Sequence, residues 1–236
     1  MWRTPYYRQR NWQRFSPMSV NPTKKGSLNF MDITYQGTTL RFTSNAEVFS
    51  PRGLDQGTET MLNHAEVHAN DRILDLGCGF GFVGVYFAAT KPEARVTMAD
   101  VDGNAVALAK ENAEQNHVTP MISQSDGFAA IRDARFDVIL SNPPYHENFS
   151  VPKHFIEGAY RQLAPNGRLY MVTKRRTWYE NKIRTVFGGV HVIEDNGYFV
   201  FAAQKRIGEH RGHTHEKQHT LSKKLQRKQA RLARNQ

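Results

Sequence analysis

The sequence has one cysteine, Cys78, in 236 residues, and no long apolar run. A membrane-spanning helix needs about 20 consecutive apolar residues, so we expect no membrane segment. A single thiol excludes an intramolecular disulfide and a cysteine-based zinc cluster, and a reducing cytoplasm is the expected location. The first residues carry no apolar stretch of the kind found in signal peptides.

Acidic residues are almost missing from both ends of the chain. Residues 1–30 hold six lysines and arginines and no acid, whereas residues 204–236 hold ten against two acids. The middle, 31–203, holds 16 basic and 20 acidic side chains and is therefore mildly acidic. The positive net charge of +10 comes entirely from the two ends. A mildly acidic core with basic ends predicts a polyanionic partner, most often nucleic acid, while tails that only increase solubility are the alternative.

The N-terminal arm interleaves its arginines with aromatic rings, namely Trp2, Tyr6, Tyr7, Trp12 and Phe15. Arginine contacts phosphate and aromatic rings stack on bases, so this pattern favours RNA as the partner. The C-terminal tail contains His215 and His219 at a spacing of four. Neither cysteines nor a carboxylate cluster accompany them, so we predict no metal site.

Strand and helix patterns alternate through the middle of the chain. The runs that predict strands are 72–76, 95–100, 119–124, 136–141 and 168–173, and helical spacing is found at 81–89, 103–116, 152–163 and 178–187. This alternation predicts an α/β fold with a doubly wound, mostly parallel, Rossmann-like sheet. Asn196-Gly197 separates the last two β-type runs and predicts a C-terminal antiparallel hairpin.

We expect four parts: a basic aromatic arm over 1–28, a β-hairpin and helix over 29–70, the α/β domain over 71–206, and a basic, histidine-containing tail over 207–236. The hairpin is predicted because two short β-type runs flank Gln36-Gly37. The helix that precedes the α/β domain is expected to extend to about His68.

A glycine-rich loop, Asp75-Leu76-Gly77-Cys78-Gly79-Phe80-Gly81, lies where the first parallel strand turns into a helix. Glycines there allow a tight turn and close approach of a ligand to the backbone. It is not the dinucleotide fingerprint, whose third glycine would fall on Phe82. The spacing resembles the loop of S-adenosylmethionine (SAM) enzymes, in which Asp75 would orient the methionine ammonium; a glycine-rich turn without a ligand is the alternative.

Acidic residues follow the next two strands. Asp100 lies about twenty residues beyond the glycine loop, where an acid accepts hydrogen bonds from ribose hydroxyls. Asp102 competes for this role, but we expect it to be a helix N-cap, and Val101 between them is a further expected cofactor contact. Asp126, before Gly127, would accept from the adenine amine of SAM, and a plain Asp-Gly turn is the equal alternative.

Asn142-Pro143-Pro144-Tyr145 follows the apolar run 136–141. The Asn142 side-chain oxygen and the carbonyl of Pro143 can both accept hydrogen bonds from one NH2 group, while the ring of Tyr145 stacks on the planar group that carries it. This pattern suits methylation of an exocyclic base amine or a side-chain amide. The alternative is a turn without a ligand, since Asn-Pro and Pro-Pro mark turns in any protein.

Basic residues accompany this turn. His146 directly follows Tyr145, so we expect it to face the substrate. The sequence does not decide whether it contacts a base or a phosphate. Lys174, Arg175 and Arg176 follow the strand over 168–173, whose carboxyl end lies on the same edge of the predicted sheet. They contact RNA phosphate or form a solvated loop.

The order of glycine loop, Asp100 and N-P-P-Y resembles class I SAM-dependent methyltransferases that act on amines. Residues 48–57, V-F-S-P-R-G-L-D-Q-G, resemble more narrowly the methyltransferase small family, whose best-known members are bacterial small-subunit rRNA guanine-N2 methyltransferases. This resemblance covers roughly residues 30–203. It implies that 71–206 is a SAM-dependent methyltransferase domain and that Phe49 and Asp55 contact the substrate.

Residues and resemblance together predict an RNA base N-methyltransferase, most specifically for guanine N2 of ribosomal RNA. Methylation of adenine N6 in tRNA or rRNA, and of the N5 amide of protein glutamine, are alternatives that the same turn permits. A non-catalytic RNA-binding assembly factor is a further alternative. The intact glycine loop, Asp100 and Asn142 argue against it.

Overall fold

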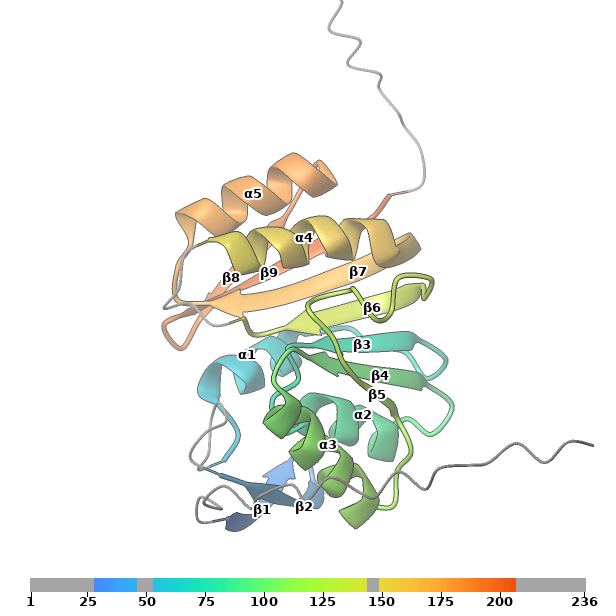
Figure 1. Ribbon diagram of the computed structural model, residues 1–236. Helices are drawn as coiled ribbons and strands as arrows, with labels where there is room; N and C mark the ends of the chain where they lie inside the picture. Colours follow the sequence, from blue (N-terminus) through green and yellow to red (C-terminus); the bar gives the residue numbers. More distant parts are fainter. Residues whose placement is uncertain (1–27, 46–52, 144–148, 207–236) are drawn as a thin grey trace, which may run out of the picture.

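The computed structural model describes residues 28–45, 53–143 and 149–206, and its centre is a seven-stranded β-sheet (Figure 1). The strands of this sheet are β3 (Arg72–Leu76), β4 (Arg95–Asp100), β5 (Met121–Gln124), β6 (Phe136–Ser141), β7 (Leu163–Thr173), β8 (His191–Asp195) and β9 (Tyr198–Gln204). The helices are α1 (Gln56–His64), α2 (Phe82–Thr90), α3 (Gly103–Gln115), α4 (Ser150–Gln162) and α5 (Thr177–Phe187). Within the described ranges, none of these helices has the length and apolar character needed to cross a bilayer.

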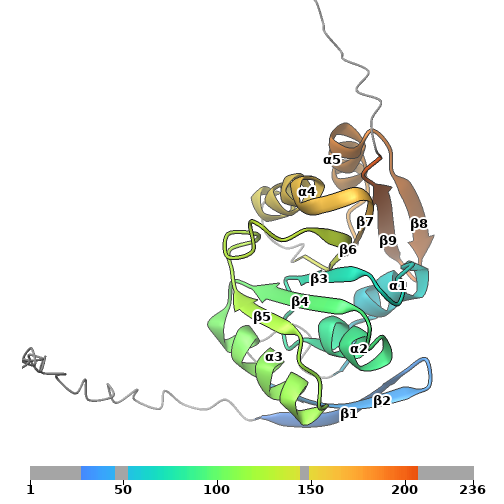
Figure 2. The same ribbon diagram turned by 90° about the vertical axis from the view of Figure 1, so that its right-hand side faces the viewer.

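The sheet has the order β5-β4-β3-β6-β7-β9-β8 (Figure 2). Strands β3 to β7 are parallel to their neighbours, whereas β9 pairs antiparallel with both β7 and β8. This confirms the predicted doubly wound, mostly parallel sheet with a C-terminal antiparallel hairpin. The chain builds outward from β3 through β4 and β5, then returns to place β6 on the other side of β3. The carboxyl ends of β3 and β6 therefore form a switch point, where open α/β sheets bind ligands.

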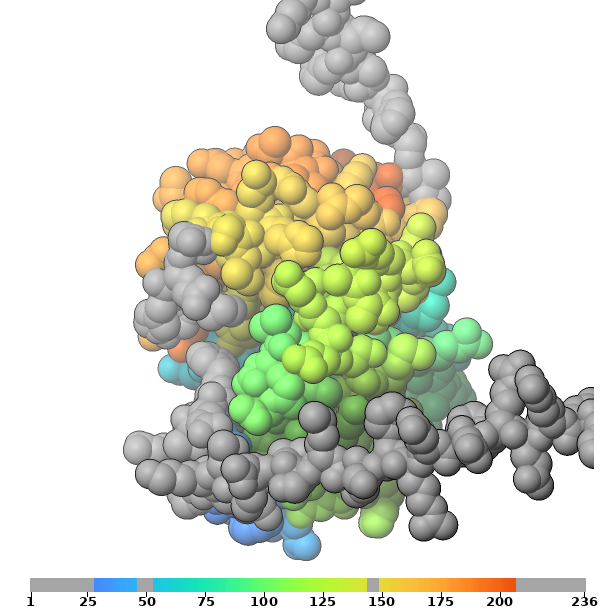
Figure 3. All heavy atoms as spheres, in the orientation of Figure 1, coloured from blue at the N-terminus to red at the C-terminus, as the bar shows by residue number. Residues whose placement is uncertain are grey.

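Alternate residues of the central strands enter two separate apolar cores. Ile73 and Val138 point into the core formed with α1, α2 and α3. Leu74 and Ile139 point into the opposite core, which α4 and α5 cover. All four side chains are fully buried, as expected for a parallel sheet with helices on both faces. Figures 1 and 3 show α4 and α5 side by side over the upper part of the molecule.

An antiparallel hairpin of β1 (Asn29–Tyr35) and β2 (Thr38–Ser44) packs on α3 through two side-chain amides. Asn112 accepts from the Thr43 amide at 2.7 Å and donates to the Thr43 carbonyl at 2.9 Å. One helical turn later, Asn116 makes the same pair of bonds to Arg41, at 3.0 and 2.6 Å. The two side-chain amides thus form hydrogen bonds with backbone groups that the edge of β2 would otherwise leave unpaired.

Both predicted hairpin turns are confirmed. Gln36-Gly37 joins β1 to β2, and Asn196-Gly197 joins β8 to β9. All four residues have positive φ, between 46° and 78°. Two consecutive positive φ values are what a two-residue type I′ turn requires, and glycine and asparagine adopt them at low cost.

Two predicted boundaries were wrong by several residues, and the strand predicted over 119–124 begins only at Met121. The helix expected to reach His68 ends at His64, because the next residues become extended and Val67 packs against the core. The strand expected from residue 168 already begins at Leu163, directly after α4. Leu163 is fully buried and pairs with Phe136 on β6, so tertiary packing extends this strand beyond its apolar run.

Candidate active site

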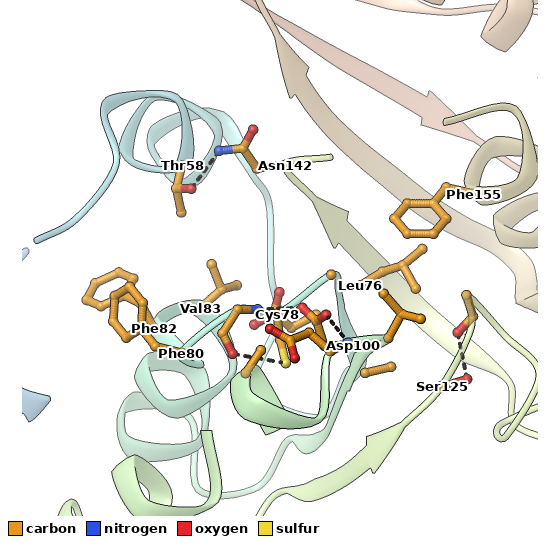
Figure 4. Close-up of a pocket in the computed structure, with 18 of the residues that line it drawn as sticks. Thr58, Leu76, Cys78, Phe80, Phe82, Val83, Asp100, Ser125, Asn142 and Phe155 are labelled. Atoms are coloured by element: carbon orange, nitrogen blue, oxygen red, sulfur yellow. Dashed lines mark hydrogen bonds between the residues drawn. The ribbon is translucent and has the colours of Figure 1, made fainter. Parts of the chain in front are cut away.

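A cavity of about 340 Å³ lies over the switch point at the carboxyl edge of the sheet. This volume is within the range of about 300–1,000 Å³ that is usual for small-molecule sites. Its wall comes from the loops after β3, β4, β5 and β6, together with α1 and α4 (Figure 4). Five aspartates line it, Asp55, Asp75, Asp100, Asp102 and Asp126, and no basic side chain of the described residues does. The cavity is therefore acidic and suits a cationic ligand.

The glycine loop after β3 borders this cavity. Gly77, Gly79 and Gly81 all have positive φ, at 76°, 55° and 96°. A Cβ atom at Gly79 would meet no atom within 4 Å, so the bare backbone there borders open space. At Gly81 the positive φ favours glycine, and a Cβ atom there would lie 3.2 Å from Cα of Ala109 on α3, so this helix packs closely against the loop.

The amide groups of this loop are already used within the chain. Gly77 and Cys78 donate to the carbonyl of Ala99 at 2.8 and 3.1 Å. Gly79 donates to Oδ2 of Asp100 at 2.8 Å. A pyrophosphate site needs amides that point freely at the ligand. The loop therefore lacks a phosphate-binding nest at these three amides, in agreement with its departure from the dinucleotide fingerprint.

Asp75, in β3, lines the cavity but is 4 % exposed. Its Oδ2 accepts from the amide of Gly84 in α2 at 3.0 Å. Burial raises the pKa of Asp75 to about 7, and the charge of Asp100 acts in the same direction. Burial also raises the pKa of the Cys78 thiol, so this cysteine is a poor nucleophile. Contact between Asp75 and a ligand ammonium stays a prediction.

Asp100, the last residue of β4, is held from two sides. Its Oδ2 accepts from Gly79, and its Oδ1 accepts from the amide of Asp102 at 3.0 Å. Each carboxylate oxygen keeps further acceptor capacity, which a ligand hydroxyl in the cavity can use. Asp102 is the N-cap of α3 and accepts from the Asn104 amide at 2.9 Å, which confirms its predicted capping role. Val101 lines the cavity and is 64 % exposed as a residue, which offers an apolar surface.

The loop after β5 forms another part of the wall. Gly127 has a φ of 55°, and its carbonyl accepts from Oγ of Ser125 at 2.9 Å, so the Asp-Gly turn is present. Asp126 is exposed and lines the cavity. A Cβ atom at Gly127 would lie 2.6 Å from the ring of His154 on α4, so glycine lets this loop approach the helix. The turn leaves the carboxylate of Asp126 available, and its contact with adenine stays a prediction.

Asn142 follows β6, and two groups beside the first turn of α1 fix its side-chain amide. Nδ2 donates to Oδ2 of Asp55 at 2.8 Å. It also donates to Oγ1 of Thr58 at 3.0 Å (Figure 4). A carboxylate accepts and does not donate, so the group facing Asp55 is the NH2 and not the oxygen. Oδ1 of Asn142 has no hydrogen-bond partner among the described residues. Asn142 therefore offers an oriented acceptor, which suits a ligand N–H group.

Asp55 is also the N-cap of α1 and accepts from the Thr58 amide at 2.9 Å. Gly57 lies directly beside it. A Cβ atom at Gly57 would be 2.7 Å from Cε1 of Tyr198 and 2.9 Å from Oδ2 of Asp55. Glycine here lets the tyrosine ring of β9 pack onto α1 without displacing the carboxylate. Sequence reasoning assigned Asp55 to the substrate; the structure makes it a partner of Asn142, and direct substrate contact stays a prediction.

Sequence reasoning missed three polar residues that hold the site. Thr58 is the second acceptor for the amide of Asn142. It lies three residues after Asp55, just beyond the segment 48–57 that the sequence singled out. Oγ of Ser141 donates to the carbonyl of Leu76 at 2.8 Å and joins the carboxyl ends of β6 and β3. Asn112 is fully buried and also donates to the carbonyl of Phe80 at 2.7 Å. No sequence signal identifies this last contact, because 32 residues separate the partners.

The remaining predicted residues divide into three groups. Pro143 is buried at the end of β6. Lys174 and Arg175 are exposed after β7 and do not line the cavity. Phe49, Pro144, Tyr145 and His146 lie outside the described residues, as do residues 1–27 of the predicted basic aromatic arm and the tail over 207–236. Within the described ranges, no group of three or more histidine, cysteine, aspartate or glutamate side chains is arranged to hold a metal ion.

A family model described as the methyltransferase small domain matches residues 39–202. The chain belongs to the methyltransferase small domain family. The matched residues contain the glycine loop, Asp100 and Asn142, and they extend from β2 to β9. Family membership confirms the resemblance that these motifs indicated.

Two curated relatives are ribosomal RNA large subunit methyltransferases G. The one from Photobacterium profundum is 33 % identical over 169 residues, which cover 68 % of this chain and 45 % of the relative. The one from Streptomyces avermitilis is 36 % identical over 164 residues, which cover 67 % of this chain and 43 % of the relative. The chain thus spans about half the length of the curated relatives that it matches.

Solved structures share this fold. A T. thermophilus 16S rRNA N2 G1207 methyltransferase in complex with AdoMet and guanosine has a TM-score of 0.72 and 25 % identity, over 78 % of this chain and 52 % of that chain. A methyltransferase from Pyrococcus furiosus has a TM-score of 0.57 and 20 % identity, over 67 % of this chain and 88 % of that chain. The second likeness shows the fold alone, and both agree with the Rossmann-like methyltransferase architecture.

Proposed function

We propose that this chain is a SAM-dependent N-methyltransferase that acts on an exocyclic amine of an RNA base, and specifically on N2 of guanine in ribosomal RNA. The observation that carries the proposal is the orientation of the Asn142 amide, whose NH2 group is held by Asp55 and Thr58 so that its oxygen serves as an acceptor. The family supports methyl transfer. The curated relatives named as rRNA methyltransferases, and the structural neighbour solved with AdoMet and guanosine, support RNA and guanine.

The cavity suits SAM in charge and in volume. Five aspartates and no lysine, arginine or histidine of the described residues line it, so it complements the positive charges of a sulfonium and an ammonium. The open space beside Gly79 admits a ligand against bare backbone. Asp75 and Asp100 would hold the methionine and ribose parts, with Val101 and Asp126 at the adenine. When bound, SAM supplies a methyl group that is activated by its sulfonium centre.

The residues of the chain would act by positioning the amine. The lone pair of an exocyclic base nitrogen is delocalised into the ring, so the amine is a poor nucleophile. Oδ1 of Asn142 and the carbonyl of Pro143 would accept its two N–H bonds and stabilise the positive charge that grows on nitrogen. Tyr145 would stack on the base, and His146 would contact the base or a phosphate. No basic side chain lines the described cavity, and we propose that the proton leaves to water.

The proposal is tested by methyl transfer from labelled SAM to separate small-subunit rRNA, large-subunit rRNA, bulk tRNA and a release factor. The RNA is then digested to nucleosides and analysed by mass spectrometry. We expect N2-methylguanosine in one of the two rRNA samples. N6-methyladenosine would overturn the guanine assignment and keep the amine chemistry, whereas label only in protein would move the chain to glutamine methylation. Absence of SAM binding in a calorimetric titration would overturn enzymatic activity altogether.

The role of Asn142 has its own test. Asn142→Ala removes the acceptor, and we expect kcat to fall roughly a hundredfold, as for loss of one oriented polar group in an active site. The Kd for SAM should change no more than about threefold, because the amine and not the cofactor uses this acceptor. Asn181→Ala is the matched control, since Asn181 is exposed on α5 and does not line the cavity. Equal losses of kcat and SAM affinity in Asn142→Ala would contradict the role.

A further inference from the structure

Three consecutive cations, Lys174, Arg175 and Arg176, follow β7, and each is exposed and lies over an aromatic ring. The distances to the ring centroids are 4.8 Å from Nζ of Lys174 to Tyr198, 5.5 Å from Cζ of Arg175 to Phe149, and 5.8 Å from Cζ of Arg176 to Phe199. Cation–π contact of this kind holds a long side chain in one place.

The sheet places two of these cations beside the candidate active site. Strand β7 runs parallel to β6, with Met171 opposite Ser141, so the end of β7 lies next to Asn142. Strand β9 then brings Tyr198 against Gly57, in the first turn of α1. Lys174, which lies over Tyr198, and Arg175 therefore flank the side of the cavity on which Asn142 is found.

Salt bridges distinguish Arg176 from Lys174 and Arg175. Arg176 pairs with Glu180 at 3.0 Å, and the same glutamate also pairs with Arg184. Among the salt bridges of the described residues, none includes Lys174 or Arg175. Two exposed positive charges after β7 are thus left without an acidic partner among the described residues.

The ring beneath Arg175 is itself fixed. Phe149 stacks on Trp178 with a centroid distance of 4.3 Å and an interplanar angle of 15°. Arg175 thus lies over a ring that a second ring holds in place. A guanidinium that is held in place before binding loses little conformational entropy when it meets a ligand.

We infer that Lys174 and Arg175 form a basic patch that binds the phosphates on either side of the methylated nucleotide. This inference rests on the proposed function. A base turned out of its helix into the cavity carries its own flanking phosphates to the edge of the cavity. A guanidinium binds two phosphate oxygens at once, and an ammonium adds a point charge. The paired Arg176 is excluded from the basic patch.

The test compares Arg175→Gln with Arg176→Gln, which remove the same charge from the same loop, and adds the double variant Lys174→Gln/Arg175→Gln. Fluorescence anisotropy gives the Kd for RNA at several salt concentrations. The RNA is the rRNA fragment that the wild-type chain methylates, or total rRNA if the chain methylates none. Loss of one phosphate contact should lower the slope of log K against log salt by about 0.7–0.9. We expect Arg175→Gln to bind roughly fivefold to tenfold more weakly at moderate salt, and Arg176→Gln to change little.

SAM affinity and thermal unfolding are measured on the same samples, and we expect both to match the wild-type chain. Equal weakening by Arg175→Gln and Arg176→Gln would overturn the inference, because total charge and not position would then decide. Wild-type affinity in the double variant, or no RNA binding by the wild-type chain, would overturn it as well. A wild-type chain that binds RNA through the basic patch but methylates none would support the patch and overturn the proposed reaction.

Discussion

Replacing Asp55 by asparagine should lower kcat without unfolding α1, because Asp55 acts on the reaction through Asn142. Asparagine has nearly the same volume as aspartate and caps a helix about equally well, so the N-terminus of α1 is retained. The substitution removes only the negative charge from the group that accepts from Nδ2 of Asn142 at 2.8 Å. The bond then changes from charge-assisted to neutral.

The size of this effect follows from hydrogen-bond strengths. Bonds to a charged group contribute about 1.5–3 kcal/mol and neutral ones about 0.5–1.5 kcal/mol, so the preference of the Asn142 amide for its orientation falls by about 1–1.5 kcal/mol. Each 1.36 kcal/mol is about tenfold in rate. If the oriented acceptor is used in the transition state, kcat should fall roughly fivefold to fifteenfold.

The assay is steady-state methyl transfer with kcat, the KM for RNA and the Kd for SAM determined separately. Glu59→Gln is the matched control, since Glu59 is an exposed acid in the same first turn of α1 and loses the same charge. We expect this control to behave as the wild-type chain. A double-mutant cycle with Asn142→Ala should be strongly non-additive, because one residue acts through the other.

Several results would refute the positioning role. Wild-type kcat in Asp55→Asn would show that the Asn142 amide needs no charged partner. Additive losses in the double-mutant cycle would show that the two residues act independently. A rise in the KM for RNA with unchanged kcat would instead favour direct contact between Asp55 and the substrate.

Three further predictions concern stability. Asn112→Ala should lower the free energy of unfolding in denaturant titrations by about 3 kcal/mol, because it leaves buried backbone groups of Thr43 and Phe80 without a hydrogen-bond partner. Asn116 is only half-buried, so Asn116→Ala should lower the free energy of unfolding less. Gly57→Ala places a methyl group against a packed tyrosine ring and should cost about 1–3 kcal/mol in calorimetry, while Gly189→Ala, which has open space around it, should be near neutral. The raised pKa of Asp75, about 7, means that the folded ligand-free chain binds this proton more tightly than the unfolded chain. Stability from this group is complete below the unfolded pKa and is lost as pH rises to about 7, so Asp75→Asn should flatten this part of the stability–pH curve relative to the wild-type chain.

Much of the fold follows from local patterns. The runs over 72–76, 95–100 and 136–141 were predicted with the bounds that the structure shows. Such runs are short, apolar and closed by glycine, aspartate or proline, so neighbouring residues suffice to define them. The end of α1 and the start of β7 were not predictable in this way. They depend on the packing of Val67 and Leu163 against residues remote in sequence.

The sequence by itself determined the glycine loop, the hairpin turns, the cap at Asp102 and the presence of an asparagine at a strand end, because each depends on backbone geometry within a few residues. Only the tertiary structure decided which way the Asn142 amide faces, since its partner Asp55 lies 87 positions away along the chain. The same holds for Arg175, whose ring partner comes from the start of α4. Hydrogen bonds and charge pairs act over a few ångströms in space, so their consequences appear only when the sheet has brought distant segments together.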